Sequence, residues 1–236
     1  VRLSPWMISH LGLSLMGKIT HNDLYIDFAT LSPEKVREKV RVGEVAITRS
    51  EYYENEDCAM MQCLDDRIGC MIIIDSILRD VKNTNDMYYV FSVQEEIGCF
   101  GAQTSTFDLQ PDLFVTFDVA STGDELRGFR TDVKLGGGAG IKVMDYFMIV
   151  NQYVVDALVD VAEKNGIKYQ IEVSEHGGTD ACTAQLVRGG MKAGAITIPT
   201  RNIHSRDEII CKEDVLDCIR MAMALETVEL DEHFGA

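Results

Sequence analysis

The apolar positions of the chain repeat with the period of a helix in several segments. The clearest case is residues 151–165, "NQYVVDALVDVAEKN", which Gly166 follows as a helix-ending residue. One face of this predicted helix carries Val154, Val155, Leu158, Val159 and Ala162. The pattern predicts further helices over residues 65–81, within 179–190, and over about 212–228. In the first of these, Asp65 and Asp66 stand where a helix N-cap belongs.

Short, nearly continuous apolar runs separate these helices and are typical of buried strands. They are "MYYVFSV" (87–93), "DLFVTFDVA" (112–120), "KYQIEVS" (168–174) and "AGAITIP" (193–199). Strands that alternate with helices favour a sheet covered on both faces. We therefore predict an α/β fold, with a three-layer α/β/α catalytic domain and a mixed, mostly parallel sheet.

The first part of the chain follows a different pattern. Two β-like pieces, "LYIDFAT" and "EVAITRS", flank the helical stretch "SPEKVREKV", in which Ser32 is the predicted N-cap and Pro33 occupies the first turn. We interpret residues 1–56 as the remnant of a small β-rich accessory or oligomerisation domain. Residues 57–236 form the predicted catalytic domain, incomplete at its N-terminus.

Composition narrows the classes of partner. The formal net charge of -16 argues against nucleic acid and against an anionic membrane surface. No apolar run has the length of a spanning helix and the first residues lack a clean secretory pattern, so we expect a cytoplasmic protein. The seven cysteines include no CxxC pair, and most are interpreted as small buried apolar residues.

Polar residues capable of chemistry follow the predicted apolar strands. Glu95 and Glu96 come after the run 87–93, Asp118 closes the stretch "LFVTF" within the next run, and His204 follows the last run. Ligands of α/β sheets bind beyond the carboxyl ends of the strands. Carboxylates that converge there repel one another unless some are protonated or a cation holds them. Oxygen and imidazole donors without thiolates suit Zn, Co or Mn, singly or as a pair of ions roughly 3.5–4 Å apart.

Adjacent side chains at the end of a strand point in different directions. The pair Glu95–Glu96 can therefore divide two tasks between its members. One glutamate can bind a metal ion while its neighbour faces the water that the ion activates.

Six ordered motifs make the chain similar to a known family. They are "CLDDRIGC", "FSVQEEIGCFGA", "FVTFDVA", "GAGIKVMD", "HGGTDA" and "ITIPTRNIHS". Together they resemble the M42 metallo-aminopeptidases, the glutamyl and deblocking aminopeptidase group in which some members carry the label endoglucanase M. The resemblance runs from about Lys18 to Glu229. It implies a co-catalytic exopeptidase with two divalent metal ions that removes N-terminal residues from peptides.

The resemblance also implies a role for each site residue. Asp65 would bridge both ions, with Glu96, Asp118 and His204 as the other ligands and Glu95 as general base and acid. Asp66 would follow a cis peptide bond between non-proline residues. Substrate-binding or ligand-supporting roles are implied for Asp66, Thr179 and Asp180.

One feature of the family has no clear counterpart. The resemblance implies one more metal-binding histidine, from an HxD motif upstream of the small inserted domain. The chain starts inside or just before the part that resembles this insert, so we expect that segment to be absent and one metal position to bind more weakly. "HND" at His21 to Asp23 matches HxD, but it adjoins the insert-like piece. His10 and His233 are interpreted as structural and solvated, and His176 has no family counterpart.

Two other functions stay open on the sequence. A glycosidase needs two carboxyl groups, roughly 5–9.5 Å from each other, on either side of the glycosidic bond. Glu95 and Glu96 are adjacent and do not flank such a bond, although Asp118 could partner one of them. The other alternative is a catalytically impaired protein that binds peptides or builds assemblies. The resemblance implies a homo-oligomer, of which a dodecamer is one form.

Overall fold

The computed structural model describes residues 26–47, 49–125, 130–229 and 234. The chain divides into two compact units, Val1–Arg49 and Ser50–Ala236. The division falls before residue 56, where the sequence pattern changes, because strand β1 (Tyr53–Glu54) pairs with β2 (Cys58–Met61) and so belongs to the large unit.

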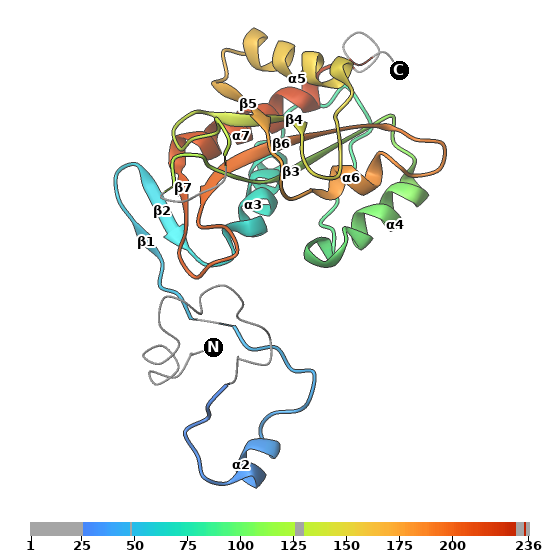
Figure 1. Cartoon of the computed structure of the whole chain (residues 1–236). Helices are drawn as coiled ribbons and strands as arrows, with labels where there is room; N and C mark the ends of the chain where they lie inside the picture. Colours follow the sequence, from blue (N-terminus) through green and yellow to red (C-terminus); the bar gives the residue numbers. More distant parts are fainter. Residues whose placement is uncertain (1–25, 48, 126–129, 230–233, 235–236) are drawn as a thin grey trace. The chain divides into compact units, whose positions relative to one another are not determined.

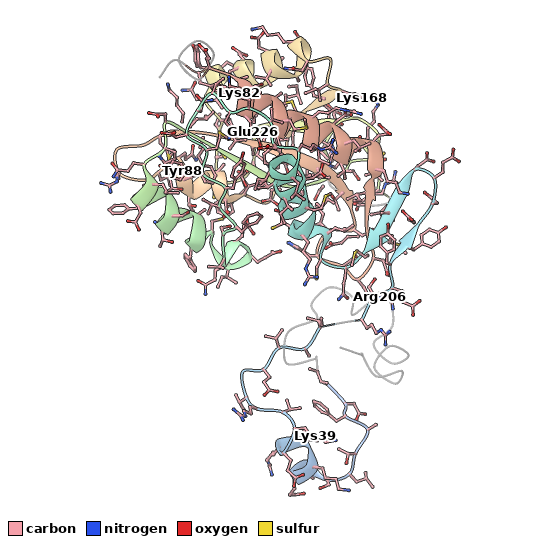
Figure 2. The ribbon with its side chains drawn as sticks, turned by 180° about the vertical axis from the view of Figure 1, so that it is seen from behind. Lys39, Lys82, Tyr88, Lys168, Arg206 and Glu226 are labelled. Carbon is pink, nitrogen blue, oxygen red and sulfur yellow. The ribbon has the colours of Figure 1, made fainter. Side chains whose placement is uncertain are left out.

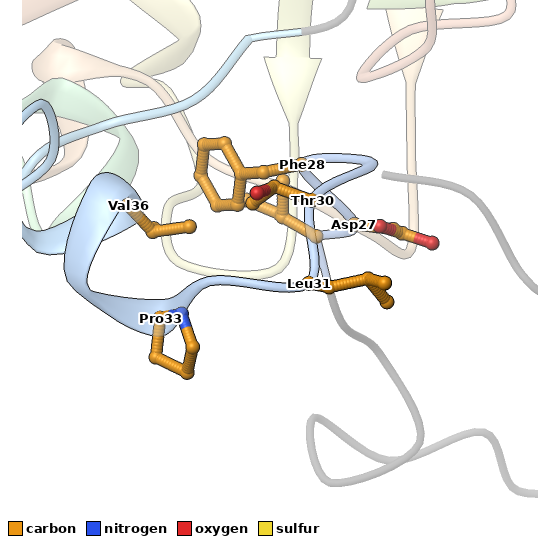
Figure 3. A pocket seen from close by; sticks show the side chains of 7 residues that line it. Asp27, Phe28, Thr30, Leu31, Pro33 and Val36 are labelled. Carbon is orange, nitrogen blue, oxygen red and sulfur yellow. The ribbon is translucent and has the colours of Figure 1, made fainter.

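The described part of the small unit contains one short helix, α2 (Pro33–Arg37). The side chain of Ser32 accepts a hydrogen bond from the Lys35 backbone N–H, so the predicted N-cap is confirmed. The two pieces predicted as β-like form no strand among residues 26–47 and 49. Beside α2, Phe28, Leu31 and Val36 line a shallow hollow (Figure 3).

The large unit is built on one seven-stranded mixed sheet (Figure 1). Its strands lie in the order β1-β2-β7-β6-β4-β5, and β3 pairs with β6. The remaining bounds are β3 (Leu113–Ser121), β4 (Ala139–Met144), β5 (Tyr169–Val173), β6 (Lys192–Arg201) and β7 (Glu208–Cys211).

The sheet is mixed, as predicted, but parallel pairs are the minority among its described strands. The pairs β3–β6 and β4–β5 are parallel, whereas β1–β2, β2–β7, β4–β6 and β6–β7 are antiparallel. The sequence prediction overlooked strands β1, β2, β4 and β7, and each antiparallel pair contains at least one of them.

Helices α3 (Leu64–Leu78), α5 (Gln152–Lys164) and α7 (Lys212–Thr227) form a row on one face of the sheet. Figure 2 shows α3 and α7 side by side. This face carries Phe117 of β3 with Ile196 and Ile198 of β6, which join the buried apolar core. The periodicity of residues 151–165 thus predicted α5 correctly, with Asn151 as N-cap and Gly166 at a positive φ of 63° after its end.

Helices α4 (Phe100–Leu109) and α6 (Asp180–Ala184) pack together, and α6 contacts β3 and β6 on the other face (Figure 1). Polar groups are buried on this side of the sheet. Lys142 of β4 lies 2.6 Å from Glu172 of β5, whose other oxygen accepts from Thr197 at 2.6 Å. The three-layer arrangement is therefore as predicted. None of the helices among the described residues combines the length and apolarity needed to cross a bilayer.

The prediction of a strand over 87–93 is wrong. The segment forms no ladder of backbone hydrogen bonds with any of the described strands. Its side chains Tyr88, Phe91 and Val93 are exposed. It nevertheless leads directly into the two glutamates, through the short 3₁₀ helix η3 (Glu95–Ile97).

Candidate metal centre

Three predicted ligands from distant parts of the chain meet at one place. Nε2 of His204 lies 3.0 Å from Oδ2 of Asp65 and 3.1 Å from Oε2 of Glu96. One ligand atom from each residue lies within 4.8 Å of the other two. Asp65 is almost fully covered, whereas His204 and Glu96 are more than half exposed. The cluster is therefore accessible from solvent.

The start of α3 sets the direction of the two aspartates. Asp65 and Asp66 have non-helical backbone angles and are joined by a cis peptide bond, as the family resemblance implied. Oδ1 of Asp66 accepts a hydrogen bond from the Gly69 N–H at 3.1 Å, which is the geometry of an N-cap. Asp66 thus starts the regular helix, and Asp65 is left to face the cluster.

The turn around η3 separates the two adjacent glutamates. Gln94 before it has a φ of 62°, and Gly98 after it has a φ of 138°. Glu96 joins Asp65 and His204, whereas Glu95 joins a second group in which one ligand atom each from Glu95, Cys99 and Asp180 lie within 4.8 Å of one another. The expectation that the neighbours face different partners therefore agrees with the geometry.

The second group is held by further hydrogen bonds. Oδ2 of Asp180 accepts from the Ser92 hydroxyl at 2.5 Å, and the Cys99 thiol donates to Oε1 of Glu95 at 3.6 Å. The other oxygen of Asp180 and the hydroxyl of Thr179 are buried without a hydrogen-bond partner in the described structure. Thr179 and Asp180 thus border the site, next to Glu95 rather than next to His204.

Asp118 is buried near the end of β3 and lies outside both ligand groups. Its Oδ1 accepts from the Val119 N–H at 2.7 Å. Burial raises the pKa of Asp118 well above its ordinary value, and the charges of Asp66, Glu95 and Asp65 raise it further. This repulsion shows that Asp118 faces the same acidic region.

The other carboxyl groups of the centre also resist ionisation. Burial, together with the charge of Glu96, raises the pKa of Asp65 to about 7, although His204 opposes the shift. Burial raises the pKa of Asp66 to about 8. Burial and the nearby Asp180 raise the pKa of Glu95. Without a cation, these crowded and buried carboxyls hold their protons more tightly than usual. A bound divalent ion would favour their charged forms, so the group is well suited to hold one.

Glu208 connects the two chain segments that supply ligands, and the sequence analysis missed it. Its buried carboxylate accepts from the Asp65 N–H at 3.0 Å and from the His204 N–H at 2.9 Å. Because both contacts are made to the backbone, no side-chain motif reveals this role. The only available signal was a glutamate four residues after the predicted histidine ligand.

Of the other histidines, only His176 lies among the described residues, and it adds no ligand to either group. His176 is exposed in the turn after β5, and its carbonyl accepts from the Ser174 hydroxyl at 2.9 Å. His10, the motif at His21 to Asp23, and His233 lie outside the described residues. The hollow beside α2 contains none of the predicted site residues.

Comparison with known protein families decides the relationship. The family model of the M42 glutamyl aminopeptidases matches residues 13–221. The chain belongs to the M42 peptidase family. Among its relatives, a lysyl aminopeptidase of Pyrococcus furiosus is 31% identical over 212 residues, which cover 89% of this chain and 60% of the relative. A glutamyl aminopeptidase of Lactococcus lactis is 31% identical over 165 residues, covering 69% of this chain and 46% of the relative.

Solved structures of aminopeptidases share the fold. A TET aminopeptidase from a marine-sediment Thaumarchaeota archaeon superimposes with a TM-score of 0.86 at 30% identity, covering 94% of this chain and 65% of that one. The aminopeptidase APDkam598 of Desulfurococcus kamchatkensis gives 0.80 at 31% identity, with 89% and 63% covered. The chain spans about three fifths of the length of the first curated relatives it matches.

Proposed function

We propose that this M42 chain contributes a divalent-metal centre to an aminopeptidase that hydrolyses the first peptide bond of peptides. The observation that carries the proposal is the convergence of Asp65, Glu96 and His204 from three distant segments, with Glu95 beside them. The donors are oxygens and one imidazole, which suits Zn, Co or Mn.

In this proposal Asp65, Glu96, Asp118 and His204 would hold the two ions, with Asp65 as the ligand shared between them. The ions, when bound, would polarise the scissile carbonyl and lower the pKa of water. The orphaned buried oxygen of Asp180 and the raised pKa values of Asp65 and Asp66 support a cation in this region.

Glu95 is the proposed general base and acid. Burial and the charge of Asp180 raise its pKa, which brings the carboxylate closer to the range needed to take a proton from water and return it to the leaving amine. Asp66, Thr179 and Asp180 would support the ligands or contact the substrate. Acidic groups of the site would attract the free amino terminus of a peptide.

The matched variants Glu95→Gln and Glu96→Gln test the division of roles. Turnover of aminoacyl-p-nitroanilides should fall at least about 100-fold in Glu95→Gln while bound metal stays at the wild-type level. Glu96→Gln should lose metal as well as activity. Metal content by elemental analysis and initial rates measure the two effects. Loss of metal in Glu95→Gln would instead place that residue among the ligands.

Two further measurements separate the peptidase from a glycosidase and from an impaired peptide-binding protein. A chelator should abolish hydrolysis of the nitroanilides, and a soluble glucan should not be cleaved with or without the chelator. Binding of peptides without any cleavage at saturating metal would favour the impaired peptide-binding protein. We also propose that the chain self-associates, since the similar TET1 peptidase of Pyrococcus horikoshii assembles into a tetrahedron or an octahedral shell.

A further inference from the structure

Two free cysteines face each other across the antiparallel strands β2 and β7 (Figure 1). Cys58 of β2 and Cys211 of β7 are directly opposite in the register of these strands. The backbone N–H of Lys212 donates to the carbonyl of Asp57 at 2.9 Å, so the neighbouring pair of residues is the hydrogen-bonded one. Hydrogen-bonded and non-hydrogen-bonded pairs alternate in an antiparallel ladder. The two cysteines therefore form a non-hydrogen-bonded pair, in which side chains come closest.

The spacing of such a pair suits a disulfide bond. Residues of a non-hydrogen-bonded pair have Cα atoms about 4.5 Å apart, and disulfides join Cα atoms roughly 4.4–6.8 Å apart. Side chains alternate between the two faces along a strand. Cys58 and Cys211 thus both point to the face opposite Ala59 and Ile210, which belong to the apolar core. The two sulfur atoms lie on the same side of the sheet.

A small molecule can reach the pair through Cys58. This residue is half-buried, whereas Cys211 is 9% exposed. Burial raises the pKa of the Cys58 thiol, and the charges of Cys211 and Asp57 raise it further, although Arg201 opposes the shift. Because the thiolate is the attacking form, reaction of Cys58 with a small disulfide should be slow at neutral pH and become faster as the pH rises.

The strands that carry the pair lead to the proposed metal centre. Strand β2 ends at Met61, shortly before Asp65, and β7 begins with Glu208. The carboxylate of Glu208 accepts from the backbone N–H groups of Asp65 and His204. A covalent bond between β2 and β7 would therefore tie together the strands next to both ligand segments.

We propose that Cys58 and Cys211 form a redox site, at which a small-molecule disulfide such as oxidised glutathione converts the two thiols into a cross-strand disulfide bond. The Cys58 thiolate attacks one sulfur of the oxidant, whose S–S bond breaks and releases a first small thiol. The Cys211 thiolate then attacks the Cys58 sulfur of the mixed disulfide and releases the second. The protein loses two electrons and two protons, and the oxidant gains both and leaves as two thiols. This site does not depend on the proposed peptidase activity.

Peptide mapping tests the bond directly. The reduced chain is incubated with oxidised glutathione at about pH 8, its remaining thiols are alkylated, and it is digested with trypsin without a reductant. Peptides 50–67 and 207–212, which carry Cys58 and Cys211, should be found linked in the mass spectrum. A phosphine should separate them. Cys58→Ser and Cys211→Ser should each abolish the linked species.

Cys63→Ser is the matched control, because peptide 50–67 also contains Cys63, and the linked species should persist in this variant. Urea unfolding is the second measurement. Oxidation should raise the midpoint of wild type, since a bond across a long loop restricts the unfolded chain, and this increase should be absent in Cys58→Ser and Cys211→Ser. The proposal is overturned if oxidised wild type shows no linked species, if the link persists in Cys58→Ser, or if oxidation does not raise the midpoint.

Discussion

Glu208 holds the backbone of two ligand segments at once. Its carboxylate accepts from the N–H groups of Asp65 and His204, and the residue is buried. Glu208→Gln should lower metal affinity about 10–100-fold, because an amide can accept only through one oxygen and places a donor against an N–H. Competition with a coloured chelator measures this affinity.

The exposed hydrogen bond from the Tyr169 hydroxyl to the Glu163 carboxylate offers a matched control for Glu208→Gln. Glu163→Gln makes the same chemical change away from the centre, so its metal affinity should equal that of wild type. Equal affinities in Glu208→Gln and wild type would show that the two segments are positioned without this carboxylate.

The acidic centre makes the stability of the metal-free protein depend on pH. The pKa values of Asp65 and Asp66 rise from 3.8 to about 7 and about 8 on folding. The folded chain therefore binds more protons than the unfolded chain between these values, and the free energy of unfolding falls as pH rises. Urea titrations of chelator-treated protein should give a lower midpoint at pH 8 than at pH 5.

The same titrations with saturating Zn²⁺ or Mn²⁺ provide the comparison. A bound cation favours the charged carboxylates, so the decline with pH should shrink or reverse. A metal-free midpoint that increases from pH 5 to pH 8 would contradict the predicted direction.

At the scale of elements, the first turn of α3 needs glycine at position 69, because the Asp66 carboxylate occupies the space of a side chain there. A Cβ at Gly69 would lie 2.4 Å from Oδ2 of Asp66, whose carboxylate caps the same turn. Alanine normally favours a helix over glycine by up to about 1 kcal/mol. We expect the opposite sign here: Gly69→Ala should destabilise the protein by about 1–3 kcal/mol, because the Asp66 side chain must move.

Gly189→Ala is the control for this change. Nothing lies within 4 Å of a Cβ at Gly189, so its effect on stability should stay within about 0.5 kcal/mol. Denaturant unfolding measures both variants. A stabilising Gly69→Ala would mean that the Asp66 carboxylate relaxes without loss.

Sequence patterns predicted those elements whose partners are implied by the pattern itself. The apolar face of α5 and the apolar runs of β3 and β6 predict burial from composition and spacing alone. Asp65, Glu96 and His204 could be predicted because they stand near the ends of elements. Segment 87–93 reads as a strand by composition, but a strand also needs a neighbour, and composition does not reveal one. The roles of Glu208 and Cys58 depend on contacts between segments far apart in sequence, so no local pattern announces them.

At the scale of the whole molecule, the assembly of the chain is open to direct measurement. We expect sedimentation velocity to detect species heavier than the 26.3 kDa monomer, with a share that grows with concentration. This follows from membership of a family in which a solved relative forms a dodecamer. A single monomeric species throughout the micromolar range would contradict the proposed self-association.

The position of β6 within the sheet has a consequence for which parts of the molecule open locally. This strand pairs with β3, β4 and β7, and His204 follows its end by only a few residues. Local opening events reach densely paired strands last. The amide hydrogens of β6 should therefore exchange with solvent more slowly than those of segment 87–93. On this expectation, the histidine side of the centre follows a strand that opens rarely, and the glutamate side follows a segment that opens more often.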